Sequence, residues 1–232
     1  MEYKPPLSFP LGKGEKRFGP VPLYFILYTL YSDMSDQILE QLFESPAKVR
    51  LLKLFLRNQK SKFTSSEVRY RTQLKWRIAQ SAMEKLRKAG VLKSYARKSS
   101  GAKNAEKTYF INPSFLFFDE LRNLVLKSSP ASKSKIVKRI KGLGRIKLVV
   151  LSGIFMRPDR ELSRTDLLVV GDDISEKRFQ NFLKQLEAEA GCEIQYSLLT
   201  SEEFNYRHKM MDRFLRDILE RSNETLINKV GV

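Results

Sequence analysis

Residues 63–111 carry the sequence FTSSEVRYRTQLKWRIAQSAMEKLRKAGVLKSYARKSSGAKNAEKTYFI, which predicts two helices and a β-hairpin. The first helix is expected to begin after Thr64, because Thr-Ser-Ser-Glu is a possible capping box. The second helix is expected over about 74–89 and should end at Gly90, since a left-handed residue commonly follows a helix. Two extended segments then enclose a basic loop rich in Ser and Gly at 97–104.

The second predicted helix should have one apolar and one polar face, because residues three or four positions apart share a side of a helix. The inner face is expected to hold Leu74, Ala79, Met83 and Leu86. The outer face is expected to hold Lys75, Arg77, Gln80, Ser81 and Glu84.

This order of helix, turn, helix and basic hairpin resembles the winged helix-turn-helix family of DNA-binding domains over about residues 36–127. In that family the second helix enters the major groove and the hairpin touches the DNA backbone or the minor groove. The resemblance implies DNA contacts from Ser65, Ser66, Gln73, Lys75, Trp76, Arg77, Gln80, Ser81, Lys85, Arg97, Lys98 and Lys103. The alternative is a winged helix that binds protein instead of DNA.

The charge of the chain is concentrated in one part of it. The 232 residues have a net charge of +17. Residues 36–130 hold 20 Lys and Arg against 8 Asp and Glu, and residues 131–145 hold 6 against none. Residues 146–232 hold 13 against 15 and are nearly neutral. This asymmetry is typical of a nucleic-acid binder fused to a neutral domain.

Cysteine and histidine usage limits the chemistry. Cys192 and His208 are the only residues of their types, so an intrachain disulfide and a Cys/His zinc cluster are both excluded. This composition fits a reducing cytoplasm. It also argues against Ser-His or Cys-His catalysis, because such a pair would have to use the single histidine, His208.

The first 35 residues are expected to be an irregular extension. Five prolines and three glycines lie within residues 1–22, and the apolar run LYFILYTLY at 23–31 is too short to cross a bilayer. That run is either an element packed on the domain or part of an over-extended start, with Met34 as the natural first residue.

The segment 128–145 is predicted to be a basic linker with a short helix, because Ser-Ser-Pro-Ala-Ser precedes KSKIVKRIKGLG. Ahead of it, 115–126 predicts a helix that packs on the winged domain or on a second copy of the chain. From 146 onward the pattern predicts a small mixed α/β domain. Its expected elements are strands at 146–151, 167–170 and 193–200, a helix capped by Ser175 and a helix at 212–220. The whole chain is therefore expected to be α+β.

The segment 146–232 resembles the minimal nucleotidyltransferase family. In that family a Gly-Ser turn holds nucleotide phosphates, and three carboxylates hold two divalent cations. Here the pattern is degenerate, with Gly153, Ile154, Arg157, Arg164, Asp166 and Gln195 at the corresponding positions. Arg164 replaces one carboxylate and Gln195 another, although a shifted register would bring Glu193 to the third position.

The resemblance therefore implies a non-catalytic domain with no metal and no cofactor, in which Arg164 pairs with Asp166 and repels Mg²⁺. An unrelated small α/β domain is the alternative. Together the two parts predict a cytoplasmic, sequence-specific binder of double-stranded DNA, a transcription regulator, with no membrane association. The second domain would serve dimerisation, ligand sensing or partner binding, and a homodimer is expected. The rival hypotheses are an active metal-dependent nucleotidyltransferase and an antitoxin-like partner of a small helical toxin.

Overall fold

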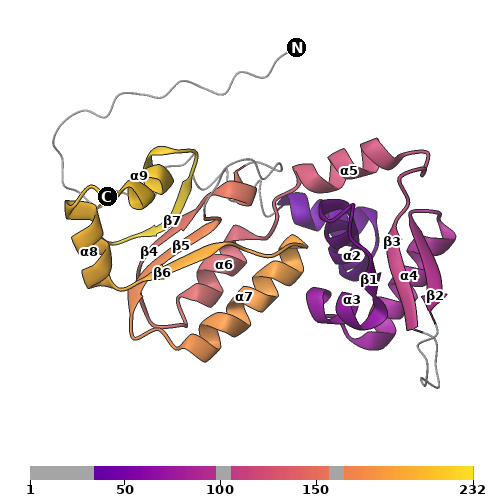
Figure 1. Ribbon diagram of the computed structural model, residues 1–232, viewed down its shortest axis with the longest axis horizontal. Helices are drawn as coiled ribbons and strands as arrows, with labels where there is room; N and C mark the ends of the chain where they lie inside the picture. The colour runs from indigo at the N-terminus through magenta and orange to yellow at the C-terminus, as the bar shows by residue number, and fades with distance from the viewer. Residues whose placement is uncertain (1–33, 98–105, 157–164, 232) are drawn as a thin grey trace, which may run out of the picture.

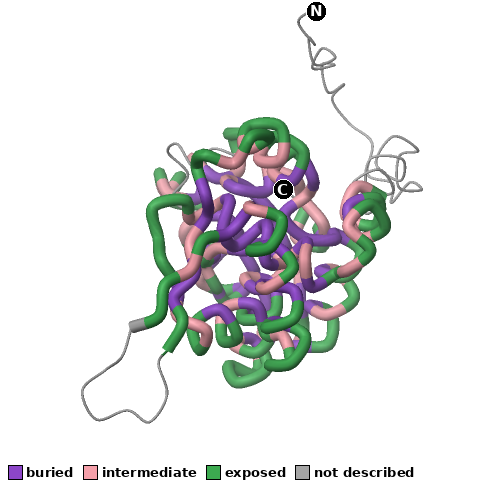
Figure 2. The backbone as a smooth tube through the Cα atoms, turned by 90° about the vertical axis from the view of Figure 1, so that its right-hand side faces the viewer, coloured by how far each residue is buried: buried purple, intermediate pink, exposed green. Residues whose placement is uncertain are grey.

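The computed structural model of the protein describes residues 34–97, 106–156 and 165–231. The described chain forms two units that lie side by side, each built around its own sheet (Figure 1). Helices and two separate sheets make the fold α+β, as the sequence predicts. Buried residues lie in the interior of the molecule, and exposed residues lie on its outer turns (Figure 2).

The N-terminal unit is mainly helical. A helical stretch at 34–42 comes first. It is followed by α2 (Pro46–Arg57), β1 (Phe63–Thr64), α3 (Ser65–Thr72), α4 (Trp76–Lys88), β2 (Leu92–Arg97), β3 (Glu106–Ile111) and α5 (Phe118–Lys127). The three strands form an antiparallel sheet in the order β1-β3-β2. The helices and this sheet enclose a core that includes Phe55, Met83 and Tyr109.

Local capping chemistry fixes where these helices begin and end. The Ser45 side chain accepts a hydrogen bond from Lys48 N, and Pro46 takes the first helical position of α2. Thr64 and Glu67 form the reciprocal capping box predicted for α3. Gly90, with φ of 81°, ends the α4 region in the left-handed conformation.

Two helices begin later than the sequence pattern indicates. Helix α4 starts at Trp76 instead of residue 74, because Gln73 adopts a left-handed conformation (φ 52°) and the turn extends to Lys75. Helix α5 starts at Phe118 instead of residue 115. There the side chain of Asn112 accepts a hydrogen bond from Ser114 N and stabilises a turn before the helix.

The C-terminal unit follows the predicted alternation of strands and helices and adds elements to it. It contains α6 (Lys133–Ile140), β4 (Arg145–Leu151), the 3₁₀ turn η1 (Gly153–Phe155), β5 (Leu167–Asp172), α7 (Glu176–Ala190), β6 (Tyr196–Leu199), α8 (Ser201–Lys209), α9 (Arg213–Glu220) and β7 (Glu224–Asn228). The sheet order is β6-β5-β4-β7, with β5 and β6 parallel and the other pairs antiparallel. The sequence pattern indicated neither α8 nor β7.

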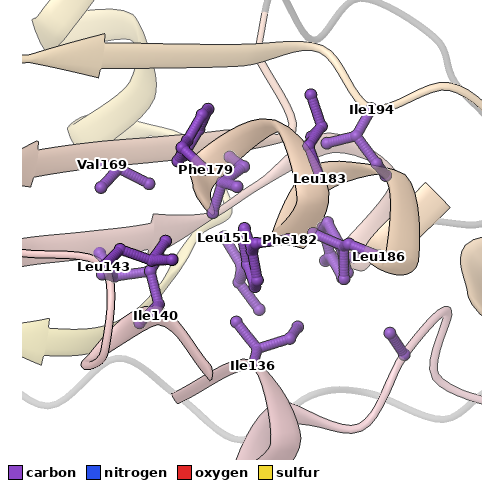
Figure 3. Packing of buried hydrophobic residues seen from close by; sticks show 14 of the residues in the cluster. Ile136, Ile140, Leu143, Leu151, Val169, Phe179, Phe182, Leu183, Leu186 and Ile194 are labelled. Carbon is purple, nitrogen blue, oxygen red and sulfur yellow. The ribbon is translucent and has the colours of Figure 1, made fainter. Parts of the chain in front are cut away.

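Both faces of this sheet are covered. Alternate residues of β4 and β5 point to opposite sides, as the period of a strand requires. One side packs on α6 and α7, with Leu151 and Val169 in the same cluster as Ile136 and Phe182 (Figure 3). The other side packs on α8 and α9, whose buried residues join a cluster with Leu148, Val150, Leu168 and Val170.

The segment 128–132 is not an exposed linker. Ser128, Pro130, Ala131 and Ser132 are buried. The Nζ of Lys53 donates hydrogen bonds to the carbonyls of Ser129 and Pro130 at 2.9 and 3.1 Å. Serine and proline usually indicate a solvated connection, but here a buried lysine satisfies the backbone carbonyls.

Lys53 also pairs with Asp36, at 2.6 Å between Nζ and Oδ1, so it connects α2 to the helical stretch at 34–42. Burial lowers the pKa of Lys53 and raises the pKa of Asp36, and their mutual attraction opposes both shifts. Residues 34 and 35, the described part of the predicted irregular extension, are helical. Residues 1–33 lie outside the described residues.

The two units meet at a close junction between α2 and the end of α7. A Cβ on Gly191, which has φ of 79°, would lie 2.5 Å from the backbone carbon of Lys53. Asn58 Nδ2 donates to the carbonyls of Leu54 and Gly191, at 2.7 and 2.8 Å. Glu189 lies 3.8 Å from Arg50, on α2. Only glycine fits this approach, so the backbone itself joins the units.

Within the described ranges, the helices are all too short or too polar to cross a membrane.

Candidate functional site

The outward face of α4 gathers the largest share of the predicted DNA-contacting residues. Ala79 and Met83 are fully buried and fix which side of the helix faces the core. The opposite side carries the exposed residues Arg77, Gln80 and Ser81, and the exposed Lys75 and Trp76 lie at the N-terminal end of the helix. These positions lie at the N-terminal half of the helix, where the first backbone N–H groups have no acceptor within the helix. The face therefore combines positive charge with long hydrogen-bonding side chains.

Glu84 is half-buried and ties α4 to the hairpin, although the sequence pattern placed it on the outer face. Its carboxylate accepts hydrogen bonds from Arg87 Nε (2.8 Å), Lys107 Nζ (3.2 Å) and the Tyr109 hydroxyl (3.1 Å). The hydrogen bond from Arg87 is the main reason that the pKa of Glu84 is lowered. Burial, and then the hydrogen bond to Glu84, raise the pKa of Tyr109 to about 12. These contacts fix the orientation of α4 against β3.

The predicted residues of α3 and the turn have different environments. Ser65 Oγ donates to the carbonyl of Lys107 at 3.1 Å, so this hydroxyl joins α3 to β3. Ser66 and Gln73 are exposed. Gln73 Nε2 donates to the carbonyl of Tyr70 and stabilises the end of α3.

The remaining predicted contacts lie at the hairpin and at the far end of α4. Arg97 is the last residue of β2 and stands opposite Glu106 in the strand register. Lys98 and Lys103 lie outside the described residues. Lys85 is exposed but borders an apolar groove of about 490 Å³ with Leu86 and Phe117. It is therefore separated by two helical turns from the N-terminal end of α4.

Ile154 and Gln195, two of the predicted degenerate transferase positions, contact Asp166 through their backbone N–H groups. This carboxylate is 2% exposed. Its Oδ1 accepts a hydrogen bond from Ile154 N at 3.0 Å, and its Oδ2 accepts one from Gln195 N at 2.9 Å. Gly153 begins the η1 turn with φ of 53°, which orients the Ile154 N–H toward the carboxylate. Asp166 thus joins the turn after β4 to the segment before β6.

This cluster has the geometry of a structural hydrogen-bond site. Both oxygens of Asp166 bind backbone N–H groups, and Ile154 is buried beside it. No group of three His, Cys, Asp or Glu residues in the described chain is arranged to hold a metal ion. Arg157 and Arg164 lie outside the described residues, and the expected pair between Arg164 and Asp166 stays a prediction.

A cleft between the two units was not predicted from the sequence. It has a volume of about 850 Å³ and is bordered by α3 on one side and by α7 and the segment before β6 on the other. Tyr70 and Tyr196 border it, and Arg71 pairs with Glu193 across it at 3.3 Å. The cleft depends on contacts between residues more than 100 positions apart, so no local pattern indicates it.

Comparisons of the chain with protein-family models, with curated proteins and with solved structures found no match. The fold and these sites define an α+β protein with a basic, exposed helix face in its N-terminal unit. Its function is therefore inferred from the geometry and charge of its own residues.

Proposed function

We propose that this protein binds double-stranded DNA in a sequence-specific way and regulates transcription. The N-terminal unit acts as a winged helix-turn-helix domain, in which α4 enters the major groove. The observation that carries the proposal is the exposed face of α4, where Arg77, Gln80 and Ser81 lie together behind the exposed N-cap residue Lys75. Arginine suits guanine and glutamine suits adenine in the major groove, so this face has the chemistry for base recognition.

The charge distribution supports the same function. Residues 36–145 hold 26 Lys and Arg and only 8 Asp and Glu. Duplex DNA carries a dense array of phosphates, and lysine and arginine release counterions when they bind it. The fixed position of α4 against β3, through Glu84, supports a common orientation for the helix and the hairpin that follows it.

The C-terminal unit serves dimerisation, ligand sensing or partner binding in this proposal, and the protein acts as a homodimer in the cytoplasm. We propose no enzymatic activity for it. Asp166 is the surviving carboxylate of the nucleotidyltransferase-like pattern, and its oxygens bind the backbone of Ile154 and Gln195. That arrangement supports a structural role, because a carboxylate so engaged offers little to a divalent cation.

Two single substitutions on α4 test the proposal. A preferred site is first selected from random duplex DNA with the purified full chain. Arg77→Ala and Gln80→Ala should each weaken binding to that site by about 1–3 kcal/mol and should relax sequence choice, because each removes a base contact. Binding to random duplex should change much less.

Arg216→Ala is the matched control, since Arg216 is an exposed arginine of α9 in the other unit. It should leave specific binding unchanged. Base recognition by α4 would be contradicted if Arg77→Ala and Gln80→Ala lowered the affinity for specific and random DNA equally. It would also be contradicted if Arg216→Ala lowered the affinity for the specific site as much as they do.

A further inference from the structure

The exposed face of α4 carries two large apolar side chains beside its polar ones. Trp76 is 41% exposed and Ile78 is 49% exposed. They flank Arg77 in the first turn of the helix. Exposed apolar side chains are common singly, but here two lie on the turn that the proposed function places against base pairs.

Neither side chain belongs to the apolar core or to the apolar groove of the N-terminal unit. Trp76 and Ile78 are absent from the buried core and from the residues packed on it. The groove uses the opposite end of α4, at Lys85, Leu86 and Ala89. Core packing and the groove therefore give no reason for apolar residues at these two positions.

Helical geometry places the two side chains on opposite edges of the exposed face. Trp76 lies one turn before Gln80, and Ile78 lies one turn before Ser81. Arg77 stands between them. Around the helix axis, the exposed face at the start of α4 therefore presents apolar Trp76, then charged Arg77, then apolar Ile78.

The major groove offers one apolar group on its base edges, the methyl group of thymine. We propose that Trp76 and Ile78 contact thymine methyl groups, so that thymines flank the base pair recognised by Arg77. This inference rests on the proposed function and adds to it the base composition of the site. Burying a methyl group against an apolar side chain excludes water from both and favours the bound state.

Replacing thymine by uracil tests the inference, because uracil keeps the hydrogen-bonding groups of thymine and lacks only the methyl group. The thymines of the selected site are replaced one at a time by deoxyuridine, and the affinity of the full chain is measured at constant salt. At the contacted thymines we expect a loss of about fourfold per methyl group removed. Ile78→Ala should lower the affinity for the thymine duplex and should abolish the loss at one of these positions, and Trp76→Ala should do so at another.

Ile38→Ala is the matched control, since Ile38 is an isoleucine of similar exposure (55%) outside α4. The Ile38→Ala variant should still lose affinity about fourfold when any contacted thymine is replaced by deoxyuridine. The inference is overturned if no deoxyuridine substitution weakens binding, or if Ile78→Ala and Trp76→Ala keep the same losses as the wild type. In either case sequence-specific binding persists and the proposed function stands. Absence of binding to any duplex overturns the proposed function and the inference together.

Discussion

Asp166 shows how a single carboxylate can join two separate segments of the chain. It is almost fully buried and accepts hydrogen bonds from two backbone N–H groups that belong to different segments. Its position in the sequence suggested a remnant of a metal site. The sequence could not show that the backbone N–H groups of Ile154 and Gln195 point at this carboxylate, and the structure does.

Replacing this carboxylate should destabilise the fold. Asp166→Ala leaves two inward-facing N–H groups without their acceptor, so we expect a loss of about 2–4 kcal/mol in the free energy of unfolding, measured by urea denaturation. Glu193→Ala is the control, because Glu193 is exposed and its ion pair with Arg71 should contribute less than about 1 kcal/mol. A cost for Asp166→Ala no larger than that of the control would rule out the structural role.

Asp172 connects β5 to the start of α8 in a similar way. Its carboxylate accepts hydrogen bonds from the N–H and the hydroxyl of Ser201, at 3.0 and 2.7 Å. The hydrogen bond from the Ser201 N–H, followed by that from the Ser201 hydroxyl, lowers the pKa of Asp172 from 3.8 to about 2. The ionised form is therefore favoured in the folded state.

This shift predicts a specific pH dependence of stability. A carboxyl group with a lowered pKa stabilises the folded state fully above its ordinary value of 3.8 and loses that effect as the pH falls through about 2. The difference in unfolding free energy between the wild type and Asp172→Asn should therefore shrink as the pH falls from 4 toward 2. A difference that stays constant over this interval would show that the charge of Asp172 is not involved.

At the scale of elements, local signals predicted most of the N-terminal unit. The capping box at Thr64 and the helix end at Gly90 both have the expected roles. The apolar strands β4 and β5 were also predicted, because runs of Val, Leu and Ile are typical of buried strands. The start of α4 was wrong by two residues, since the left-handed Gln73 lengthens the turn.

Two elements were missed for different physical reasons. Helix α8 is polar along most of its length, and only Ser201 and Phe204 are buried, so its apolar period is weak. Its Thr200 cap and the Glu203 that follows three residues later repeat the pattern at Thr64, and that signal could have identified it. Strand β7 is short and pairs with β4, about 75 residues earlier, so no local pattern indicates it.

At the scale of the whole molecule, the junction between the units depends on one glycine. Gly191→Ala should destabilise the protein, because the new Cβ would overlap the backbone of Lys53 and Leu54. Gly231→Ala is the matched control, since Gly231 has the same φ of 79° and no atom within 4 Å of an added Cβ. Both variants carry the left-handed strain of about 1–2 kcal/mol.

The unfolding free energy should therefore fall about 1–3 kcal/mol further in Gly191→Ala than in Gly231→Ala, because only Gly191 adds overpacking. Equal costs would mean that the two units do not meet as closely as the Gly191 contact requires. The sequence could not reveal this junction, since a glycine after a helix is adequately explained as a C-terminal cap.

Binding of double-stranded DNA by the basic N-terminal unit is the proposal on which the others depend. Its most direct test is the affinity of the purified full chain for duplex DNA between about 50 and 200 mM salt. We expect the affinity to fall steeply with salt, linearly on a log–log scale, because lysine and arginine displace counterions from the phosphates. Binding that is absent, or that is insensitive to salt over this range, would contradict it.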